Sequence, residues 1–209
     1  MTECFFELSE DFSQEWLPKF TAVFEFYKRH AVDKDSLLRK LHLGYTAMRS
    51  EAFDFVAAEF PWLEDFRVRH NLDKKLNFLE THGIDKPEFK IHIDGRPGDP
   101  EVMFNVPILN CTAETVTYWV QPVDDFNPVL SCENGTNNNS KHGATPHLPA
   151  NVRYDIIAQH SFTNKAALFR SDIYHGVINN SNRDEYRIMM HWWFPKGTSW
   201  SMAKTYFDL

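Results

Sequence analysis

The sequence predicts an α+β fold in which helices come first and an antiparallel double sheet follows. Residues 1–85 repeat apolar side chains at spacings of three and four, which is the period of a helix. From Pro87 onward the period changes to two, in short segments that turn-forming clusters separate. About seven or eight short strands with irregular loops favour a sandwich or barrel over a parallel sheet. We therefore expect one structural domain, in which a mainly helical portion (residues 1–85) supports a sheet core (residues 86–209).

Three helices are expected in the N-terminal portion, at residues 15–30, 33–58 and 71–82. The first has a single apolar stripe with charges opposite, formed by Trp16, Phe20, Val23, Phe24 and Tyr27. The second repeats this pattern and stops before Pro61, with Asp35 or Ser36 as its N-cap. The third is shorter, and Gly83 closes it.

The strands are expected at residues 89–94, 102–109, 115–120, 152–158, 166–169, 173–178 and 187–194. Turn clusters at residues 95–100, 134–140 and 179–184 separate several of them. The polar, Asn-rich residues 132–147 are expected to form a long surface loop, and the sequence leaves open whether this loop is a lid.

Charge and composition limit the kinds of partner. The formal net charge is -7 and the pI is about 5.8, and no cluster of Lys and Arg is interleaved with glycine and aromatic residues. A nucleic-acid partner is therefore not expected. A small molecule or a protein side chain is the expected substrate, and nothing in the pattern indicates an oligomeric state.

The cysteines and the N-terminal residues favour a cytoplasmic protein. Cys4, Cys111 and Cys132 form no C-x-x-C pair and are odd in number, so we expect reduced thiols. The N-terminal residues carry acids where a signal peptide needs positive charge followed by an apolar run. No apolar stretch has the length of a membrane span, so no membrane partner is expected.

One candidate metal motif lies in the stretch KIHIDGRPGD, where His92 and Asp94 are separated by a single residue. A chain with 10 His in 209 residues contains about one H-x-D by chance, so the tripeptide alone is weak. Taken by itself, it is better read as a solvated strand end before a turn. Support has to come from elsewhere in the chain.

A second informative stretch is IYHGVINNSNRDEYRIMMHWWF at residues 173–194, which reads as a β-hairpin. On its return strand Arg187, Met189, His191 and Trp193 share one face, and both faces are largely apolar. The strand is therefore expected to be buried on both sides, where an Arg needs a partner. No acid of the hairpin is an evident partner, and the planar guanidinium suits a carboxylate ligand.

Two imidazoles and one carboxylate that leave the opposite metal positions open form the facial triad of non-haem Fe(II) oxygenases. The order of these residues resembles the Fe(II)/2-oxoglutarate-dependent oxygenase superfamily. An H-x-D comes first, His175 follows after a gap of tens of residues, and Arg187 lies about a dozen residues further on. The resemblance covers roughly the C-terminal half. Its strand-rich region looks like that family's double-stranded β-helix (jelly roll), and the N-terminal helices look like those that buttress its larger sheet. The compact size and the H-G-V at His175 are similar to small aspartyl/asparaginyl- or prolyl-hydroxylase-like members.

The resemblance implies a role for each matching residue. His92, Asp94 and His175 would bind Fe(II), with 2-oxoglutarate and O2 as co-substrates. Arg187 would bind the distal carboxylate of 2-oxoglutarate. Thr117, within TVTYW, would contact the co-substrate through its hydroxyl, with Tyr118 or Asn105 as alternatives. An aspartate at position 94, where halogenating relatives carry a small residue, favours hydroxylation.

Several alternatives stay open. Arg183 is a rival for the carboxylate, although its turn also holds Asp184 and Glu185, and Arg96 is a candidate contact for an acidic substrate or simply a solvated loop residue. His191 is expected to be hydrogen-bonded in the core or behind the ligands, and not a fourth ligand. The alternative function is a non-catalytic cupin-like protein that binds a metal or small ligand, and a third is a cupin-type metalloenzyme without a 2-oxo acid. Only a keto-acid co-substrate requires a buried cation such as Arg187 near the metal.

Overall fold

The computed structural model describes residues 3–32, 47–48, 50–81, 91–94, 98–123, 148, 152–180 and 187–209. Its helices are α1 (Glu10–Val32), α3 (Ser50–Glu59), α4 (Pro61–Arg69) and α6 (Trp200–Thr205). Its strands are β1 (Phe5–Glu7), β2 (Ala47–Met48), β3 (Leu76–Thr81), β4 (Val102–Leu109), β5 (Thr115–Pro122), β6 (Tyr154–His160), β7 (Ala167–Arg170), β8 (His175–Asn179) and β9 (Arg187–Trp193). None of the described helices is both long enough and apolar enough to cross a bilayer.

The strands form two antiparallel sheets. The larger has the order β1-β7-β4-β9-β3-β2, and the smaller has the order β6-β5-β8. Along the chain, β4 lies in the large sheet, β5 and β6 in the small, β7 in the large, β8 in the small and β9 in the large. His92 forms a bridge to His175 and so adds the segment 91–94 to the free side of β8. This connectivity is that of a jelly roll, which confirms the predicted fold class.

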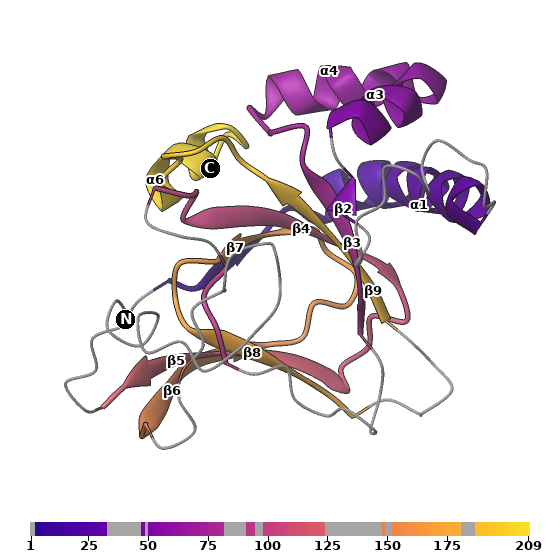
Figure 1. The fold of residues 1–209 in the computed structure, drawn as a ribbon. Coiled ribbons are helices and arrows are strands. Elements are labelled where there is room, and N and C mark those ends of the chain that lie inside the picture. The colour runs from indigo at the N-terminus through magenta and orange to yellow at the C-terminus, as the bar shows by residue number, and fades with distance from the viewer. Residues whose placement is uncertain are drawn as a thin grey trace.

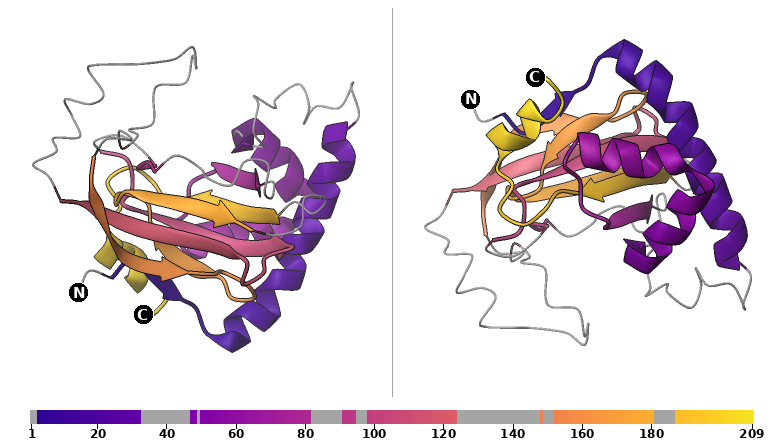
Figure 2. Two further views of the ribbon diagram at one scale, coloured as in Figure 1. Left: turned by 90° about the horizontal axis from the view of Figure 1, so that it is seen from below. Right: turned by 90° about the horizontal axis from the view of Figure 1, so that it is seen from above.

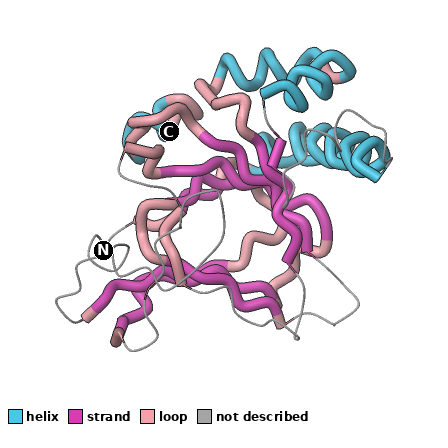
Figure 3. Tube along the Cα trace, in the orientation of Figure 1, coloured by secondary structure: helices cyan, strands magenta, loops and turns pink. Residues whose placement is uncertain are grey.

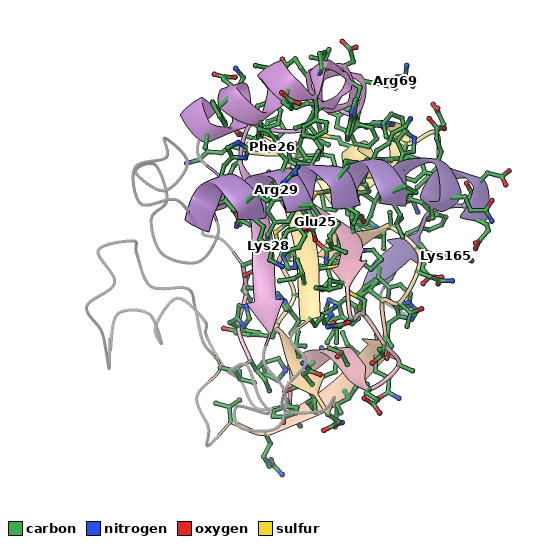
Figure 4. All side chains as sticks on the ribbon, turned by 90° about the vertical axis from the view of Figure 1, so that its right-hand side faces the viewer. Glu25, Phe26, Lys28, Arg29, Arg69 and Lys165 are labelled. Carbon is green, nitrogen blue, oxygen red and sulfur yellow. The ribbon has the colours of Figure 1, made fainter. Side chains whose placement is uncertain are left out.

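The helices cover the outer face of the large sheet, which lies between them and the small sheet (Figure 1). Helices α1, α3 and α4 are grouped on one side of the strands (Figure 3), and seen from above α3 and α4 overlie the large sheet with α1 alongside (Figure 2). Phe26 lies on the side of α1 that meets α3 and α4 (Figure 4), where its ring is 6.0 Å from that of Phe55. The predicted support of the sheet by N-terminal helices is therefore present.

Strict alternation along β9 divides the interior into two parts. Ile188, Met190 and Trp192 belong to the main core beneath the helices, whereas Met189 belongs to a second cluster between the sheets. The first part is a dry aromatic core, in which Phe20 and Trp192 are 0% exposed. The second part contains the polar side chains considered below. As predicted, β9 is buried on both faces.

The predicted hairpin of residues 173–194 is wrong. Strand β8 pairs with β5 in the small sheet, and β9 pairs with β3 and β4 in the large sheet. As a result, His175 and Arg187 approach the interior from opposite sheets instead of lying side by side on one.

The predicted helix at residues 71–82 is also wrong, because its second half is strand β3. Leu76 and Phe78 pack in the main core while Asn77 and Leu79 line an interior cavity, which is the alternation of a strand. Leu72, Leu76 and Leu79 have helical spacing, but hydrogen bonding to β2 on one side and β9 on the other overrides that local signal.

The second predicted helix, at residues 33–58, is replaced in its described part by β2 and α3. The helix before Pro61 does end there, because α3 stops at Glu59. Pro61 is also the first residue of the next helix, α4, where its missing N–H costs no hydrogen bond. Residues 33–46 and 49 lie outside the described part, as do the Asn-rich stretch 132–147 and residues 89–90 of the first predicted strand.

Candidate metal centre

Backbone hydrogen bonds hold His92 and His175 opposite each other. The amide of His92 donates to the carbonyl of His175 at 2.9 Å, and the amide of His175 donates to the carbonyl of His92 at 2.9 Å. Two residues further on, the amide of Asp94 donates to the carbonyl of Ser171 at 3.0 Å. The three predicted metal ligands are therefore fixed by main-chain contacts between segments about 80 residues apart in sequence.

The side chains of these residues converge. His92 Nε2 lies 3.2 Å from Asp94 Oδ1, and His175 Nε2 lies 3.2 Å from Asp94 Oδ2. One potential ligand atom from each of the three residues lies within 4.8 Å of the others. The side chain of His175 is 4% exposed, whereas those of His92 and Asp94 are 17% and 23% exposed. The cluster is thus embedded on one side and accessible on the other.

The charge states of this cluster suit a divalent cation. Burial raises the pKa of the Asp94 carboxyl, but hydrogen bonds and charges from His175 and then His92 outweigh it and hold the pKa well below its usual value. His175 Nδ1 lies 2.8 Å from the carbonyl oxygen of Ile173, so this nitrogen carries the proton and donates. Nε2 is then the nitrogen that faces Asp94, where without a metal it donates to the carboxylate and where, deprotonated, it would offer its lone pair to a metal. An imidazole oriented by a carbonyl in this way is the usual arrangement behind a metal-binding histidine.

The triad opens into a cavity of about 160 Å³ between the two sheets. Its lining residues come from both sheets and from the segment 91–94: Asn77, Leu79, His92, Asp94, Met103, Asn105, Thr117, Phe169, His175, Val177, Arg187, His191 and Trp193. On the large-sheet side, lining residues of the neighbouring strands β3, β9 and β4 lie opposite one another. Trp193 lies opposite Met103, and His191 lies opposite both Asn77 and Asn105. Arg187 lies at the far end of β9.

Arg187 is the charged group deep in this cavity, and only 3% of its surface is exposed. Burial lowers the pKa of its guanidinium, and the neighbouring Cys111 thiol partly offsets that effect. Its Nε has no hydrogen-bond partner, and no carboxylate in the described ranges forms an ion pair with it. A buried guanidinium without an acid costs several kcal/mol, which an anionic ligand would offset.

Other polar atoms of the cavity also lack partners. Among the described residues, the buried atoms without a hydrogen bond include Asn77 Oδ1, Asn105 Oδ1 and Trp193 Nε1. Native proteins contain few such atoms, and each commonly marks an absent water, ion or ligand. Their concentration around one cavity points to a polar ligand there.

The remaining predicted site residues fall into three groups. Thr117 and Asn105 line the cavity, from the small and the large sheet respectively. Tyr118 points to the other side of β5, where it packs with Val120 and Tyr174. Arg96 and Arg183 lie outside the described residues. His191 lines the cavity but does not belong to the metal cluster.

Several lining residues escaped the sequence analysis, among them Asn77 and Phe169. Asn77 was assigned to a helix, and Phe169 was taken as an ordinary strand residue. The alternation of Leu76 and Phe78 with Asn77 and Leu79 was the available signal for a strand with one polar face. Cys4 and Cys111 form no disulfide within the described residues, and Cys132 lies outside them.

Solved structures similar to this chain include three whose names mention related chemistry. CytC3 with Fe(II) and α-ketoglutarate is 11% identical, with 92% of this chain and 73% of that chain covered and a TM-score of 0.46. The non-heme α-ketoglutarate-dependent epimerase SnoN from nogalamycin biosynthesis is 11% identical, with 91% and 79% covered and a TM-score of 0.44. A Pseudomonas putida prolyl-4-hydroxylase is 11% identical, with 87% and 83% covered and a TM-score of 0.37.

No protein-family model matches the chain, and neither does any curated protein sequence. Because each of these three structures is only 11% identical to this chain, the function has to be argued from the chain's own residues.

The side chains present fit Fe(II) and a small dicarboxylate. Two imidazoles and one carboxylate would form a donor set for Fe(II) with open positions on the remaining side. The guanidinium of Arg187, whose Nε is unpaired, fits a carboxylate, and the side-chain amides of Asn77 and Asn105 fit further oxygen atoms. A cavity of about 160 Å³ is large enough for a small dicarboxylate.

The buried His191 is expected to make the metal-free protein sensitive to acid. Burial lowers the pKa of its imidazole from 6.5 to about 4, so between these values the unfolded chain binds a proton that the folded protein does not. Stability should therefore fall as the pH is lowered through this window, by up to about 1.4 kcal/mol per pH unit from this residue. Urea denaturation of wild type and His191→Phe between pH 7 and pH 4 tests this, and equal slopes in both proteins would assign the effect to other groups.

Gly176 follows the ligand His175 and packs against the ring of Tyr118 across the small sheet. A Cβ at this position would lie 2.6 Å from Tyr118 Oη and 2.8 Å from Cζ. Gly176→Ala should therefore cost about 1–3 kcal/mol through overpacking, or a melting temperature lower by about 2–10 °C. Thermal denaturation in the Tyr118→Phe background should show a smaller loss, because the nearest atom is gone. An equal loss in both backgrounds would rule out this contact as the cause.

Proposed function

We propose that this chain is an Fe(II)- and 2-oxoglutarate-dependent dioxygenase that hydroxylates a substrate still to be identified. The observation that carries the proposal is the presence, in one cavity, of a His-Asp-His cluster and a buried arginine without an acid partner among the described residues. The first supplies metal ligands, and the second supplies the cation that a dicarboxylate co-substrate needs.

His92, Asp94 and His175 would hold the iron, and Arg187 would bind the distal carboxylate of 2-oxoglutarate. Bound Fe(II) with 2-oxoglutarate and O2 supplies the oxidising power, which no amino-acid side chain has. The contribution of the chain is to orient these groups. The carbonyl oxygen of Ile173 fixes the tautomer of His175. Strand β9 holds Arg187 at the end of the cavity away from the triad.

The cavity wall also excludes water from the site. Phe169, Met103 and Val177 line it between the polar groups, and the ring of Phe169 packs edge-on against that of His175 at 4.7 Å. Thr117 lines the small-sheet side, where its hydroxyl is our candidate for a further co-substrate contact. The substrate is expected to approach from the side of the cluster on which His92 and Asp94 are accessible.

The proposal is tested by ligand-dependent stability without turnover. With Mn(II) in place of Fe(II), the metal should raise the melting temperature, and 2-oxoglutarate should raise it further only when the metal is present. At ligand concentrations of 100 times the dissociation constant, each step should add about 2.7 kcal/mol, or about 5–10 °C. Stabilisation by metal with no further effect of 2-oxoglutarate would contradict the proposal and favour the cupin-like alternative.

A further inference from the structure

Three polar side chains form a row across the inner face of the large sheet. Asn77 on β3 pairs in register with His191 on β9, and His191 pairs on its other side with Asn105 on β4. All three line the cavity that contains the triad. Because directly paired residues point to the same face, the row Asn77–His191–Asn105 is a continuous polar strip on one wall.

Two side chains of this row carry a buried oxygen that has no hydrogen-bond partner in the described part of the chain. These are the Oδ1 atoms of Asn77 and Asn105, and the partly exposed side chain of His191 lies between the two residues. An unmade hydrogen bond of a buried polar group destabilises a protein, so two such oxygens on one strip are not explained by the fold. Apolar side chains of similar size would serve a purely structural wall better.

The row lies between the two ends of the proposed co-substrate site. Arg187 precedes His191 by four residues on the same face of β9, about 13 Å along the strand. At the other end, the triad lines the same cavity as the row. A ligand that reached from a metal bound at the triad toward Arg187 would therefore pass along the row.

The chemistry of the row suits one end of a 2-oxo acid. Its members are two uncharged amides and an imidazole whose pKa burial lowers, whereas the full positive charges would lie elsewhere, on a bound metal and on Arg187. Each amide can turn its Nδ2 toward a ligand oxygen without breaking a hydrogen bond of its Oδ1, because that atom has no partner. Neutral donors of this kind fix the direction of a carboxylate and a keto oxygen without neutralising the metal-bound anion.

We propose that the row Asn77–His191–Asn105 binds the carboxylate-and-keto end of the 2-oxo acid whose distal carboxylate binds Arg187. This inference rests on the proposed function and assigns the recognition of that end to three residues of the large sheet. It also predicts that the row and Arg187 recognise different parts of the ligand. Their substitutions can therefore be separated with a ligand that lacks the distal carboxylate.

The test compares 2-oxoglutarate with pyruvate, a 2-oxo acid without the distal carboxylate, by calorimetric titration into Mn(II)-loaded protein without oxygen. Asn105→Leu and His191→Phe should each weaken the binding of both ligands by about tenfold or more, because each removes a hydrogen bond to a charged ligand. Arg187→Met should weaken only 2-oxoglutarate. Arg67→Met, a substitution on α4 outside the cavity lining, should change neither affinity by more than about twofold.

Stability without ligand separates recognition from a structural role. The row variants replace polar side chains of the cavity wall by apolar ones, so the melting temperature of the metal-free protein should rise or stay unchanged. A loss of stability in both row variants would overturn the inference in favour of a structural network. The inference would also be overturned if the row variants bound both ligands like the wild type while Arg187→Met failed to bind 2-oxoglutarate. A wild-type protein that binds neither ligand would instead overturn the proposed function itself.

Discussion

Arg187→Met is expected to weaken 2-oxoglutarate binding by about 30-fold to more than 1,000-fold and to leave metal affinity nearly unchanged. The guanidinium is 3% exposed and has no acid partner among the described residues, so a bound carboxylate would be its main electrostatic contact. Removing one side of a buried, hydrogen-bonded charge pair costs about 2–5 kcal/mol, which gives this range. Methionine keeps most of the length and apolar volume of the arginine stem.

The same substitution should stabilise the ligand-free protein. Wild type buries a charge that no described acid compensates, and an apolar replacement removes that cost. Titration calorimetry and thermal denaturation of the same samples measure both effects. Arg67→Met is the matched control, because Arg67 forms hydrogen bonds of 2.7 Å with Glu64 on α4, away from the cavity lining. An unchanged 2-oxoglutarate affinity in Arg187→Met would move the carboxylate site to another cation, with Arg183 as the first candidate.

His175→Ala is expected to weaken divalent metal binding by more than about 100-fold. Loss of groups that only support metal ligands already costs about 10- to 100-fold, and His175 is the most buried of the three proposed ligands. The 2-oxoglutarate-dependent rise in melting temperature should disappear with the metal, even though Arg187 is intact. Equilibrium dialysis against Mn(II) or Co(II) measures the first effect, and thermal denaturation measures the second.

His160→Ala is the control for this second prediction. His160 is a partly buried histidine that lies 2.8 Å from Glu7 at the edge of the small sheet, and it does not line the cavity. Its removal should leave metal affinity unchanged. If His175→Ala bound Mn(II) like the wild type, the cluster of His92, Asp94 and His175 would not be the metal site.

The candidate site was predictable from sequence because its residues are of rare types at informative positions. His92, Asp94 and His175 lie beside strands that alternation identifies, and the residues that share a face of β9 follow from the period of a strand alone. Arg187 was distinguished by an argument about charge, since a strand that is apolar on both faces cannot solvate a guanidinium. These inferences depend on local pattern and on burial, both of which the sequence carries.

The errors concern pairing between distant strands. A polar turn cluster between two apolar strands predicts a hairpin, and nothing local distinguishes it from a connection between opposite sheets. Likewise, β3 has apolar residues at helical spacing and becomes a strand only because β2 and β9 pair with its two edges. This second error concealed Asn77, and with it one third of the polar row.

The correction changes how the site is understood. In a hairpin, His175 and Arg187 would lie on neighbouring strands of one sheet, with no enclosed space between them. With β8 and β9 in opposite sheets, their side chains approach one cavity from both walls, which gives a small anion an enclosed place between metal and guanidinium. Enclosure also strengthens each electrostatic interaction in the site, because water is excluded.

The measurement that tests the central claim most directly is the formation of succinate from 2-oxoglutarate by the wild-type protein with Fe(II), ascorbate and O2. Our account predicts slow succinate formation even without the substrate, and its loss in His175→Ala and in Arg187→Met under the same conditions. His160→Ala should retain it. A wild-type protein that forms no succinate, and whose melting temperature neither Fe(II) nor 2-oxoglutarate raises, would contradict the assignment of this site to an Fe(II)- and 2-oxoglutarate-dependent dioxygenase.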